Sequence, residues 1–581
     1  MIEIKTNVLI VGGGVGGCAA ALACARMGVA CLTTEPTDWI GGQLTVQGVP
    51  PDENRWIEDF GGNRSYQELR EGVRRYYRQV RGGLRPEAAA DPRLNPGNGW
   101  VSRLCAEPRI WHDVLAGMLA AAGLSWKSAP EAVNGSSHVL LKHEPIGADV
   151  DGDKIRAVRF RDGGSGAEVV VSAEIVLDAT ETGDVLELAG VEHAIGAEHQ
   201  GVYGELHGRT DFDTAKRLDP LDQQACSWCF AVEHRPGEEH TIRRPDRYSW
   251  WRGYVPDMRP GWCGAEAGRG GDPLFSWTVP SHAPPGCRTL RMIPWPDEPP
   301  QGELEMWRYR RIVDSSLYSG QRLPGDGPSR DHPDVSLINM VQMDYWQKPL
   351  LGVSTAERES ALAGAREQSL CWLHWMQTEA PRHDGKGCGY PGLKLRGDEL
   401  GTTDGFAKGV YIREPRRLIA RTIVTEAHVG TEQRKADGWD KRDPDWSRVQ
   451  DGGQGWGTCE KFEDSVGIGH YMIDLHPSCA GRNNVYVPAA PFRVPMGALI
   501  PVRVRNLLAA GKCLGVSHIA NGAYRMHHVE WSVGEAAGVL AAFCLGMRTE
   551  PQAVHASAAR VREVQRALGD QGVRLAWPWE G

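Results

Sequence analysis

The chain of 581 residues is too long for a single hydrophobic core, and its 41% of hydrophobic residues suits a large globular protein of two or three domains. Its net charge of −9 gives no basic surface for nucleic acid or for an anionic membrane. Glu3 speaks against a secretory leader, and no run approaches the roughly eighteen apolar residues of a membrane span.

The first predicted elements are a buried parallel strand at residues 8–11 and a glycine turn that fits GxGxxG at Gly12, Gly14 and Gly17. The first glycine permits the tight turn, the second lets the backbone approach a pyrophosphate, and the third lets the helix at residues 15–27 lie close to the sheet. Phosphates would then bind at the N-terminus of that helix, where free N–H groups favour anions.

A second strand is predicted at residues 29–33, with Glu35 at its end and seventeen residues between Glu35 and Gly17. A carboxylate at that place accepts hydrogen bonds from the hydroxyl groups of a ribose. With the turn and the helix in register, the sequence predicts a dinucleotide site.

The following loop contains the pair Gly41-Gly42 and then Gln43. It resembles flavoproteins of the glutathione-reductase-like superfamily, in which a Gly-Gly pair after the acidic residue runs alongside the isoalloxazine ring. The resemblance implies FAD as cofactor. The disulfide reductases of that superfamily carry two cysteines next, where this chain has Leu44 and Val49, so the resemblance implies no dithiol chemistry.

A capping box formed by Ser65 and Glu68 predicts the start of an amphipathic helix whose arginines, among them Arg70 and Arg74, form a solvated face. Another helix is predicted at residues 109–122. Alternating runs then predict an antiparallel meander, followed by a buried strand at the end of which Ala179 and Thr180 resemble residues that pass near the cofactor. The predicted meander strands are 139–141, 155–160 and 169–171, and the buried strand is 175–180.

From about residue 202 the alternation of strands and helices stops, and thirteen of the 21 tryptophans lie between Trp228 and Trp456. The predicted fold class is α/β: a Rossmann-like FAD-binding domain with a meander, interrupted by a substrate domain with a mixed or antiparallel sheet. The predicted boundaries are 1–201 for the first part of the FAD-binding domain, 202–494 for the substrate domain, and 495–581 for the closing part. The tryptophans could form a core or stack on a substrate.

The closing part contains an apolar strand that ends at Gly511, then Arg525, and a small-residue helix at 534–542 expected to lie against the flavin. It resembles the closing FAD motif of the FAD-dependent oxidoreductase family that includes the heterodisulfide-reductase flavin subunit. Segments at 344–345, 411–417 and 474–477 resemble its substrate-domain signatures. The candidates for FAD contact are Gly12, Gly14, Gly17, Glu35, Gly41, Gly42, Gln43, Ala132, Ala179, Thr180, Gly511 and Arg525.

Cys226 and Cys229 form a CxxC pair within a predicted strand. Structural cysteines are the favoured interpretation, with zinc binding and redox chemistry as alternatives, and no metal site is predicted. The fourteen cysteines follow no disulfide framework, which suits a cytoplasmic protein.

No second GxGxxG unit precedes a helix, so a dedicated NAD(P)H domain is not expected. We therefore expect FAD-dependent oxidation of a small organic substrate by hydride transfer, as a dehydrogenase or an oxidase. A flavin monooxygenase and an electron-transfer subunit acting with a protein partner remain as alternatives. Self-association into a homo-oligomer is left open.

Such a reaction needs a base for the substrate proton and a cation for an anionic substrate group. His476, which follows an apolar strand, is one candidate base, and His527 and His528 are the others. Arg413 is the candidate cation, although it could instead belong to an ion-pair knot with Glu414, Arg416 and Arg417.

Overall fold

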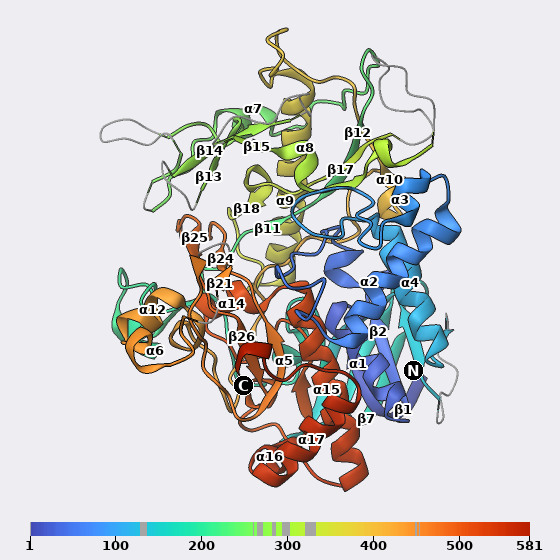
Figure 1. Ribbon diagram of the computed structural model, residues 1–581, viewed down its shortest axis with the longest axis vertical. Helices are drawn as coiled ribbons and strands as arrows, with labels where there is room; N and C mark the ends of the chain where they lie inside the picture. The colour runs from blue at the N-terminus through green and yellow to red at the C-terminus, as the bar shows by residue number, and fades with distance from the viewer. Residues whose placement is uncertain are drawn as a thin grey trace.

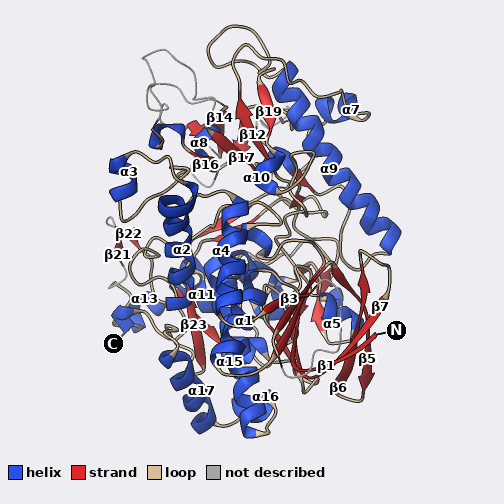
Figure 2. Ribbon diagram, turned by 90° about the vertical axis from the view of Figure 1, so that its right-hand side faces the viewer, coloured by secondary structure: helices blue, strands red, loops and turns tan. Residues whose placement is uncertain are grey.

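An eight-stranded sheet forms the centre of the computed structural model, which describes residues 2–127, 136–259, 261–263, 271–281, 286–292, 303–319, 333–447, 450–451 and 454–580. The strand order is β3-β4-β2-β1-β7-β6-β5, and β27 also pairs with β7. Figure 2 labels β1, β3, β5, β6 and β7 of this sheet. The strands are β1 (Ile2–Val11), β2 (Cys31–Glu35), β3 (Ser125–Lys127), β4 (His138–Leu141), β5 (His143–Asp151), β6 (Lys154–Asp162), β7 (Glu168–Asp178) and β27 (Leu507–Ala509).

The predicted parallel core of this sheet is confirmed. β1 pairs in parallel with β2 and with β7, and the apolar residues at 8–11 are fully buried between layers. The helix α1 (Val15–Arg26) follows the glycine turn, and Glu35 ends β2 as expected. β27, from the far end of the chain, pairs in parallel with the last residues of β7, so both ends of the chain build one sheet.

The predicted meander is correct for two of its three strands. β5, β6 and β7 form the antiparallel succession, but residues 139–141 belong to β4, which pairs in parallel with β2 and β3. β7 is also longer than predicted, because one strand contains both the last meander strand and the separate buried strand expected at 175–180. Its first half pairs with β6 and its last residues pair with β27.

The helices α14 (His518–Tyr524) and α15 (His527–Met547) return the C-terminal part to the glycine turn, where α15 lies beside α1 (Figure 1). The prediction that a helix starts at residue 534 is wrong. A side chain at Gly534 would overlap the backbone of Gly16, and one at Gly538 would overlap that of Ala20. These small residues therefore serve close packing of α15 on α1.

Among the described residues, only α15 has the length and hydropathy of a membrane-spanning helix, and 83% of its apolar window is buried inside the molecule. The helix α15 is a core helix, because it packs on α1 and beside β23 (Ser465–Gly469).

The helix α2 (Arg64–Tyr76) differs from its prediction in two ways. Asn63 is its N-cap, and the Ser65 hydroxyl donates to Glu535 at 2.8 Å, so the predicted capping box is wrong. Arg70 is fully buried and pairs with Glu53 at 2.9 Å and with Glu58 at 2.5 Å. The prediction of a solvated face is thus wrong for Arg70 and for Arg74, which also pairs with Glu58.

A second hydrophobic core lies in the upper part of Figure 1, separate from the core around the central sheet. It packs a four-stranded antiparallel sheet and a mixed three-stranded sheet against the long helix α9 (Thr355–Thr378). Seven of the thirteen tryptophans between Trp228 and Trp456 are buried in this second core: Trp251, Trp262, Trp277, Trp307, Trp346, Trp372 and Trp375. The two sheets consist of β16 (Arg311–Val313), β17 (Val335–Ile338), β12 (Phe230–His234) and β19 (Leu393–Leu395), and of β13 (Thr278–Pro280), β14 (Cys287–Arg291) and β15 (Glu303–Glu305).

Short strand pairs connect the two cores and carry the polar residues discussed below. They are β11 (Cys226–Ser227) with β18 (Asp344–Tyr345), β24 (Ile473–Leu475) with β25 (Val485–Val487), and β23 with β26 (Phe492–Pro495). Apolar residues of β23 to β26 are buried in the same core as the central sheet.

The remaining helices are short, apart from α4 and α17. They are α3 (Pro86–Ala90), α4 (Pro108–Ala121), α5 (Asp184–Leu188), α6 (Gln200–Tyr203), α7 (Tyr248–Gly253), α8 (Met306–Tyr309), α10 (Gly397–Leu400), α11 (Glu426–Val429), α12 (Thr431–Ala436), α13 (Trp439–Arg442), α16 (Pro551–His555) and α17 (Ala558–Asp570). The remaining strands are β8 (His193–Ala194), β9 (Ala197–Glu198), β10 (Leu218–Asp219), β20 (Arg417–Leu418), β21 (Gln450–Asp451) and β22 (Gln454–Gly455).

Candidate functional site

The glycine turn between β1 and α1 has the geometry that a phosphate cradle requires. Gly12 has φ +103°, and a Cβ there would overlap the carbonyl group of Ala179. A Cβ on Gly17 would overlap the carbonyl oxygen of Gly12. Gly14 is the N-cap of α1 and has no side chain to cap the first N–H groups. These donors and the helix dipole favour an anion at this end of α1.

Glu35 lies beside this turn and is buried. Its carboxylate accepts hydrogen bonds from the backbone N–H groups of Gly13 at 3.1 Å and Thr37 at 2.9 Å. Burial raises the pKa of the Glu35 carboxyl to about 7, against the hydrogen bonds from Thr37. The structure thus brings the acidic residue at the end of β2 to the glycine turn.

Three charged residues that the sequence analysis missed complete this region. The Glu181 carboxylate lies 2.8 Å from the place of a Cβ on Gly14 and forms an ion pair with the buried Lys512. Glu530, in the first turn of α15, accepts from Gln43 at 2.5 Å and from the N–H of Gly16 at 3.4 Å. Burial, together with the charge of Glu181, raises the pKa of Glu530 to about 7. Carboxylates therefore lie at the end of α1 that attracts anions.

These residues fit a dinucleotide. The turn offers backbone donors at the start of α1 for a pyrophosphate, and Glu35 offers an acceptor for ribose hydroxyls. The buried Lys512 is already paired with Glu181. Most of the predicted cofactor residues lie together at this turn. Ala179 and Thr180, for example, lie directly beside Gly12. The others of this group are Gly14, Gly17, Glu35, Gly41, Gly42, Gln43 and Gly511. Ala132 lies outside the described residues.

A cavity of about 290 Å³, lined by both polar and apolar side chains, lies between the two cores. Arg525 connects it with the glycine turn, since its carbonyl oxygen accepts from Gln43 at 3.1 Å while its side chain lines the cavity. The lining also includes Arg413 and His476. The remaining polar lining residues are Asp52, Ser281, Arg288, Tyr309, Arg310, Asn339, Tyr411, Tyr471, Asp474, Asn484 and Tyr486.

His476 is held in this cavity by two carboxylates. Its Nδ1 lies 2.5 Å from Oδ2 of Asp344, and its Nε2 lies 3.5 Å from Oδ2 of Asp474. Arg413 supports the arrangement, because its Nη2 lies 3.0 Å from the other oxygen of Asp344. Burial raises the pKa of the Asp344 carboxyl, but Arg413 and His476 outweigh this effect and keep that pKa below its usual value. Asp344 is therefore a carboxylate at neutral pH.

The model of the family described as FAD dependent oxidoreductase matches residues 7–568. The chain belongs to this family. It is an FAD-dependent oxidoreductase, and FAD is its cofactor, in agreement with the glycine turn and with Glu35. No curated protein matches the chain significantly.

Solved enzyme structures are similar to part of this FAD-dependent oxidoreductase. L-proline dehydrogenase from P. horikoshii is 14% identical over 34% of this chain and 25% of its own, with a TM-score of 0.17. The rebeccamycin biosynthetic enzyme RebC is 15% identical over 40% of this chain and 39% of its own, with a TM-score of 0.21. The flavin-dependent monooxygenase PieE is 15% identical over 63% of this chain and 47% of its own, with a TM-score of 0.23. The chain thus spans less than half of each of these proteins.

The oxidoreductase's three candidate histidines occupy different surroundings. Only His476 lines the cavity. His527 is fully buried and accepts from the N–H of Asp52 at 3.1 Å, and burial lowers its pKa well below its usual value. His528 accepts from the N–H of His470 at 3.4 Å, and burial lowers its pKa to about 4.

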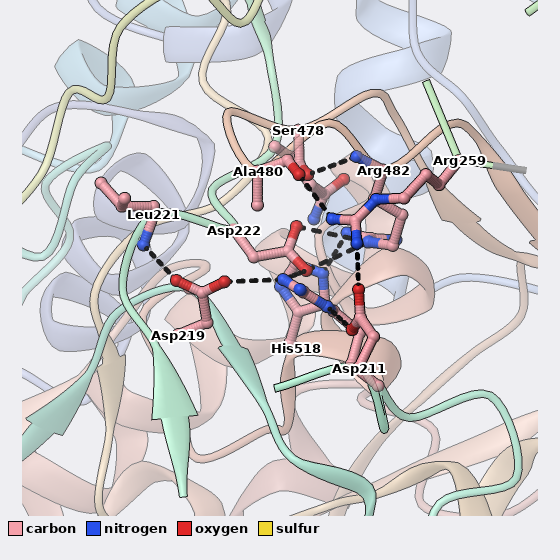
Figure 3. A network of polar contacts seen from close by, with 12 residues as sticks. Asp211, Asp219, Leu221, Asp222, Arg259, Ser478, Ala480, Arg482 and His518 are labelled. Atoms are coloured by element: carbon pink, nitrogen blue, oxygen red, sulfur yellow. Dashed lines mark hydrogen bonds and ion pairs between the residues drawn. The ribbon is translucent and has the colours of Figure 1, made fainter. Parts of the chain in front are cut away.

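Of the four residues of the expected ion-pair knot, only Glu414 and Arg417 pair with each other. Arg416 pairs instead with Asp184 and Glu187, and Arg413 is not part of the knot. Arg417 forms a buried pair with Glu414, and Glu414 accepts from His518 at 2.8 Å. Figure 3 shows how this network continues from His518 to Arg482 and Asp222. Because Arg413 instead pairs with Asp344 and lines the cavity, it is available to the site.

The CxxC cysteines lie inside the protein and not on its surface. Cys226 and Cys229 are both buried, and burial raises the pKa of each thiol to about 12. Thiols in this state are poor nucleophiles and poor metal ligands, which favours the structural interpretation.

Proposed function

We propose that this enzyme oxidises a small polar organic molecule, with hydride transfer to FAD and transfer of the accompanying O–H or N–H proton to His476. The observation that carries the proposal is the hydrogen bond between His476 and the buried Asp344 at the wall of a cavity that several polar side chains line. A histidine that is oriented by a carboxylate and open to a cavity is suited to act as a general base.

Each residue of the site has its own role in the proposed proton transfer. In this proposal Nδ1 of His476 donates to Asp344, so Nε2 is the nitrogen that takes the proton from the substrate. The resulting imidazolium would lie between the carboxylates of Asp344 and Asp474, which stabilise its charge. Arg413 keeps Asp344 in place and ionised. FAD, when bound, supplies the acceptor for the hydride, which carries the two electrons of the oxidation.

Residues 202–494 are proposed to form the substrate domain, and the second core with its separate sheets supports this for Ala225 to Ile412. Apolar residues from Leu418 onward lie in the core of the central sheet. A relationship to the glutathione-reductase-like flavoproteins is also proposed. Gly41 supports it, because this glycine follows Glu35 in the chain and has a φ of +104°, a backbone conformation that favours glycine. Leu44 and Val49 are buried apolar side chains, so this proposal includes no thiol relay at these positions.

The site supports turnover of a small molecule more than electron transfer to a protein, because the cavity lies between the cores and contains a base. A cytoplasmic location, and the absence of nucleic-acid and membrane partners, are proposed on the net charge and the scattered cysteines.

The test is anaerobic mixing of the FAD-loaded protein with libraries of polar small molecules, followed by flavin absorbance. Bleaching by a small molecule supports the proposal. Reduction only by NAD(P)H would favour a monooxygenase, and reduction only through a second protein would favour an electron-transfer subunit. Either of the last two results would overturn direct oxidation of a substrate.

A further inference from the structure

The cavity contains more positive than negative side chains. Arg525 pairs with Asp474 at 3.1 Å, and Arg413 pairs with Asp344 at 3.0 Å, so these two guanidinium groups are neutralised within the protein. Two further arginines line the cavity, Arg288 and Arg310. Neither makes an ion pair with a carboxylate in the described part of the chain; Arg288 donates to the hydroxyl of Ser281 at 2.8 Å.

Arg310 is the better placed of these two cations. It follows α8, stacks on the ring of Tyr309 at 4.4 Å, and donates from Nη1 to the carbonyl oxygen of Asn339 at 2.7 Å. These contacts fix the plane of the guanidinium group. Its Nε is buried and has no hydrogen-bond partner among the described residues, and no bond from its Nη2 occurs there either.

Asp52 is the remaining acidic residue of the lining, and it does not neutralise Arg310. Its Oδ1 accepts from Tyr471 at 3.4 Å, and it forms no ion pair with a described cation. Burial raises the pKa of the Asp52 carboxyl, although Arg310 and Arg525 act in the opposite direction.

We propose that the substrate is a small organic acid and that Arg310 binds its carboxylate, with Arg288 as the supporting cation. The free Nε and Nη2 of a guanidinium group form the pair of parallel donors that matches the two oxygens of a carboxylate. This inference rests on the proposed function and moves the task of anchoring the substrate from Arg413 to Arg310. The volume of about 290 Å³ lies near the lower end of ligand pockets, roughly 300–1,000 Å³, which favours a small acid.

The test measures binding separately from oxidation. Anaerobic FAD-loaded protein is titrated with acetate, glycolate, lactate, succinate and benzoate, and with the corresponding neutral amides, while tryptophan fluorescence and flavin absorbance are recorded. We expect saturable binding of at least one acid and a loss of roughly tenfold or more for its amide, because a hydrogen bond to a charged group contributes about that factor. Inorganic phosphate is titrated in parallel and should bind more weakly than that acid.

The variants are Arg310→Gln and Arg310→Lys, with Arg308→Gln as the control, since Arg308 is a more exposed arginine two positions earlier. Arg310→Gln should weaken binding of the acid by roughly tenfold or more, Arg310→Lys should recover part of it, and the control should bind like the parent. Equal binding of the acid by parent and Arg310→Gln, equal binding of acid and amide, saturation of no acid, or preference for phosphate would each overturn the inference.

The two proposals can fail separately. If an acid binds through Arg310 but none bleaches the flavin, the carboxylate site stands and direct oxidation fails. If neutral molecules bleach the flavin and acids neither bind nor compete with them, the oxidation stands and the carboxylate site fails.

Discussion

His476 and Asp344 share a hydrogen bond of 2.5 Å although 132 positions separate them in the sequence. Asp344 lies in β18, on the side of the second core, and His476 directly follows β24, whose apolar residues pack with the central sheet. The hydrogen bond therefore joins the two cores at the cavity wall. A base built across such a boundary depends on the relative position of the two parts.

The first prediction concerns the base. Replacing His476 by alanine removes the only one of the three candidate histidines that lines the cavity. Since a general base contributes ~10²–10⁴-fold, we expect stopped-flow flavin reduction by the substrate to slow by that factor, with an unchanged spectrum of bound flavin. The control is His240→Gln, a histidine near the surface that pairs with Glu238. A parent-like rate in the His476→Ala protein would remove His476 from the mechanism.

The second prediction separates two glycines of the cradle. Gly14 has φ −64°, which any residue adopts, and a side chain there first meets the flexible end of Glu181. Gly14→Val should therefore fold but lose FAD, because the new side chain lies where a phosphate must approach. Gly12, with φ +103° and backbone directly beside it, should not tolerate valine.

The measurements for this pair are bound flavin per protein after gel filtration and circular dichroism of the protein freed of FAD. Gly14→Val should show parent-like circular dichroism without flavin, whereas Gly12→Val should lose the folded signal or express as aggregates. Full flavin occupancy in Gly14→Val would place the pyrophosphate elsewhere.

The cradle could be predicted from sequence because its parts are local. The strand, the glycine turn and Glu35 lie within about one βαβ unit. The spacing of the glycines directly indicates where the backbone turns tightly or approaches another group closely. The same local logic failed for the start of α15. The small residues near position 534 do not mark a helix start, since α15 begins at His527. Gly534 and Gly538 allow close contact with Gly16 and Ala20, from the other end of the chain.

The cavity could be predicted only in part, because its charges pair over long sequence distances. His476 and Arg413 were identified singly, but Asp344, which joins them, was identified only through a resemblance. Arg310 was missed, since its significance lies in the lack of a described carboxylate partner, and no local pattern shows that. Arg70 was assigned to a solvated face because its partner Glu53 lies on a loop outside the helix.

The third prediction tests that correction. Arg70 and Glu53 are both buried side chains in an ion pair of 2.9 Å. Replacing Arg70 by methionine leaves the carboxylates of Glu53 and Glu58 without this partner, and breaking a buried pair costs about 3–5 kcal/mol of unfolding free energy. The control is Arg75→Met on the exposed side of the same helix, which should change stability by about 0.5 kcal/mol or less. Urea denaturation of both proteins makes the comparison, and equal midpoints would show that the Arg70 pair contributes nothing.

The last prediction concerns pH and the buried histidines. Burial lowers the pKa of His528 to about 4 in the folded protein, whereas an unfolded histidine has a pKa of about 6.5. Between these two values the unfolded chain binds more protons, so this histidine makes the free energy of unfolding fall as the pH is lowered from about 6.5 towards about 4, by up to about 1.4 kcal/mol per pH unit. Above pH ~6.5 the contribution is constant.

His528→Gln isolates this contribution, because glutamine can still accept from the N–H of His470 but does not take up a proton. The buried carboxyls with raised pKa, such as Glu35 and Glu530, act in the opposite direction but are present in both proteins. Their effects cancel in the difference between parent and variant. Urea denaturation between pH 4.5 and 7.5 should therefore show a difference that is constant at neutral pH and shifts steadily in favour of the variant below pH ~6.5. A difference independent of pH would mean that His528 is protonated equally in the folded and unfolded states.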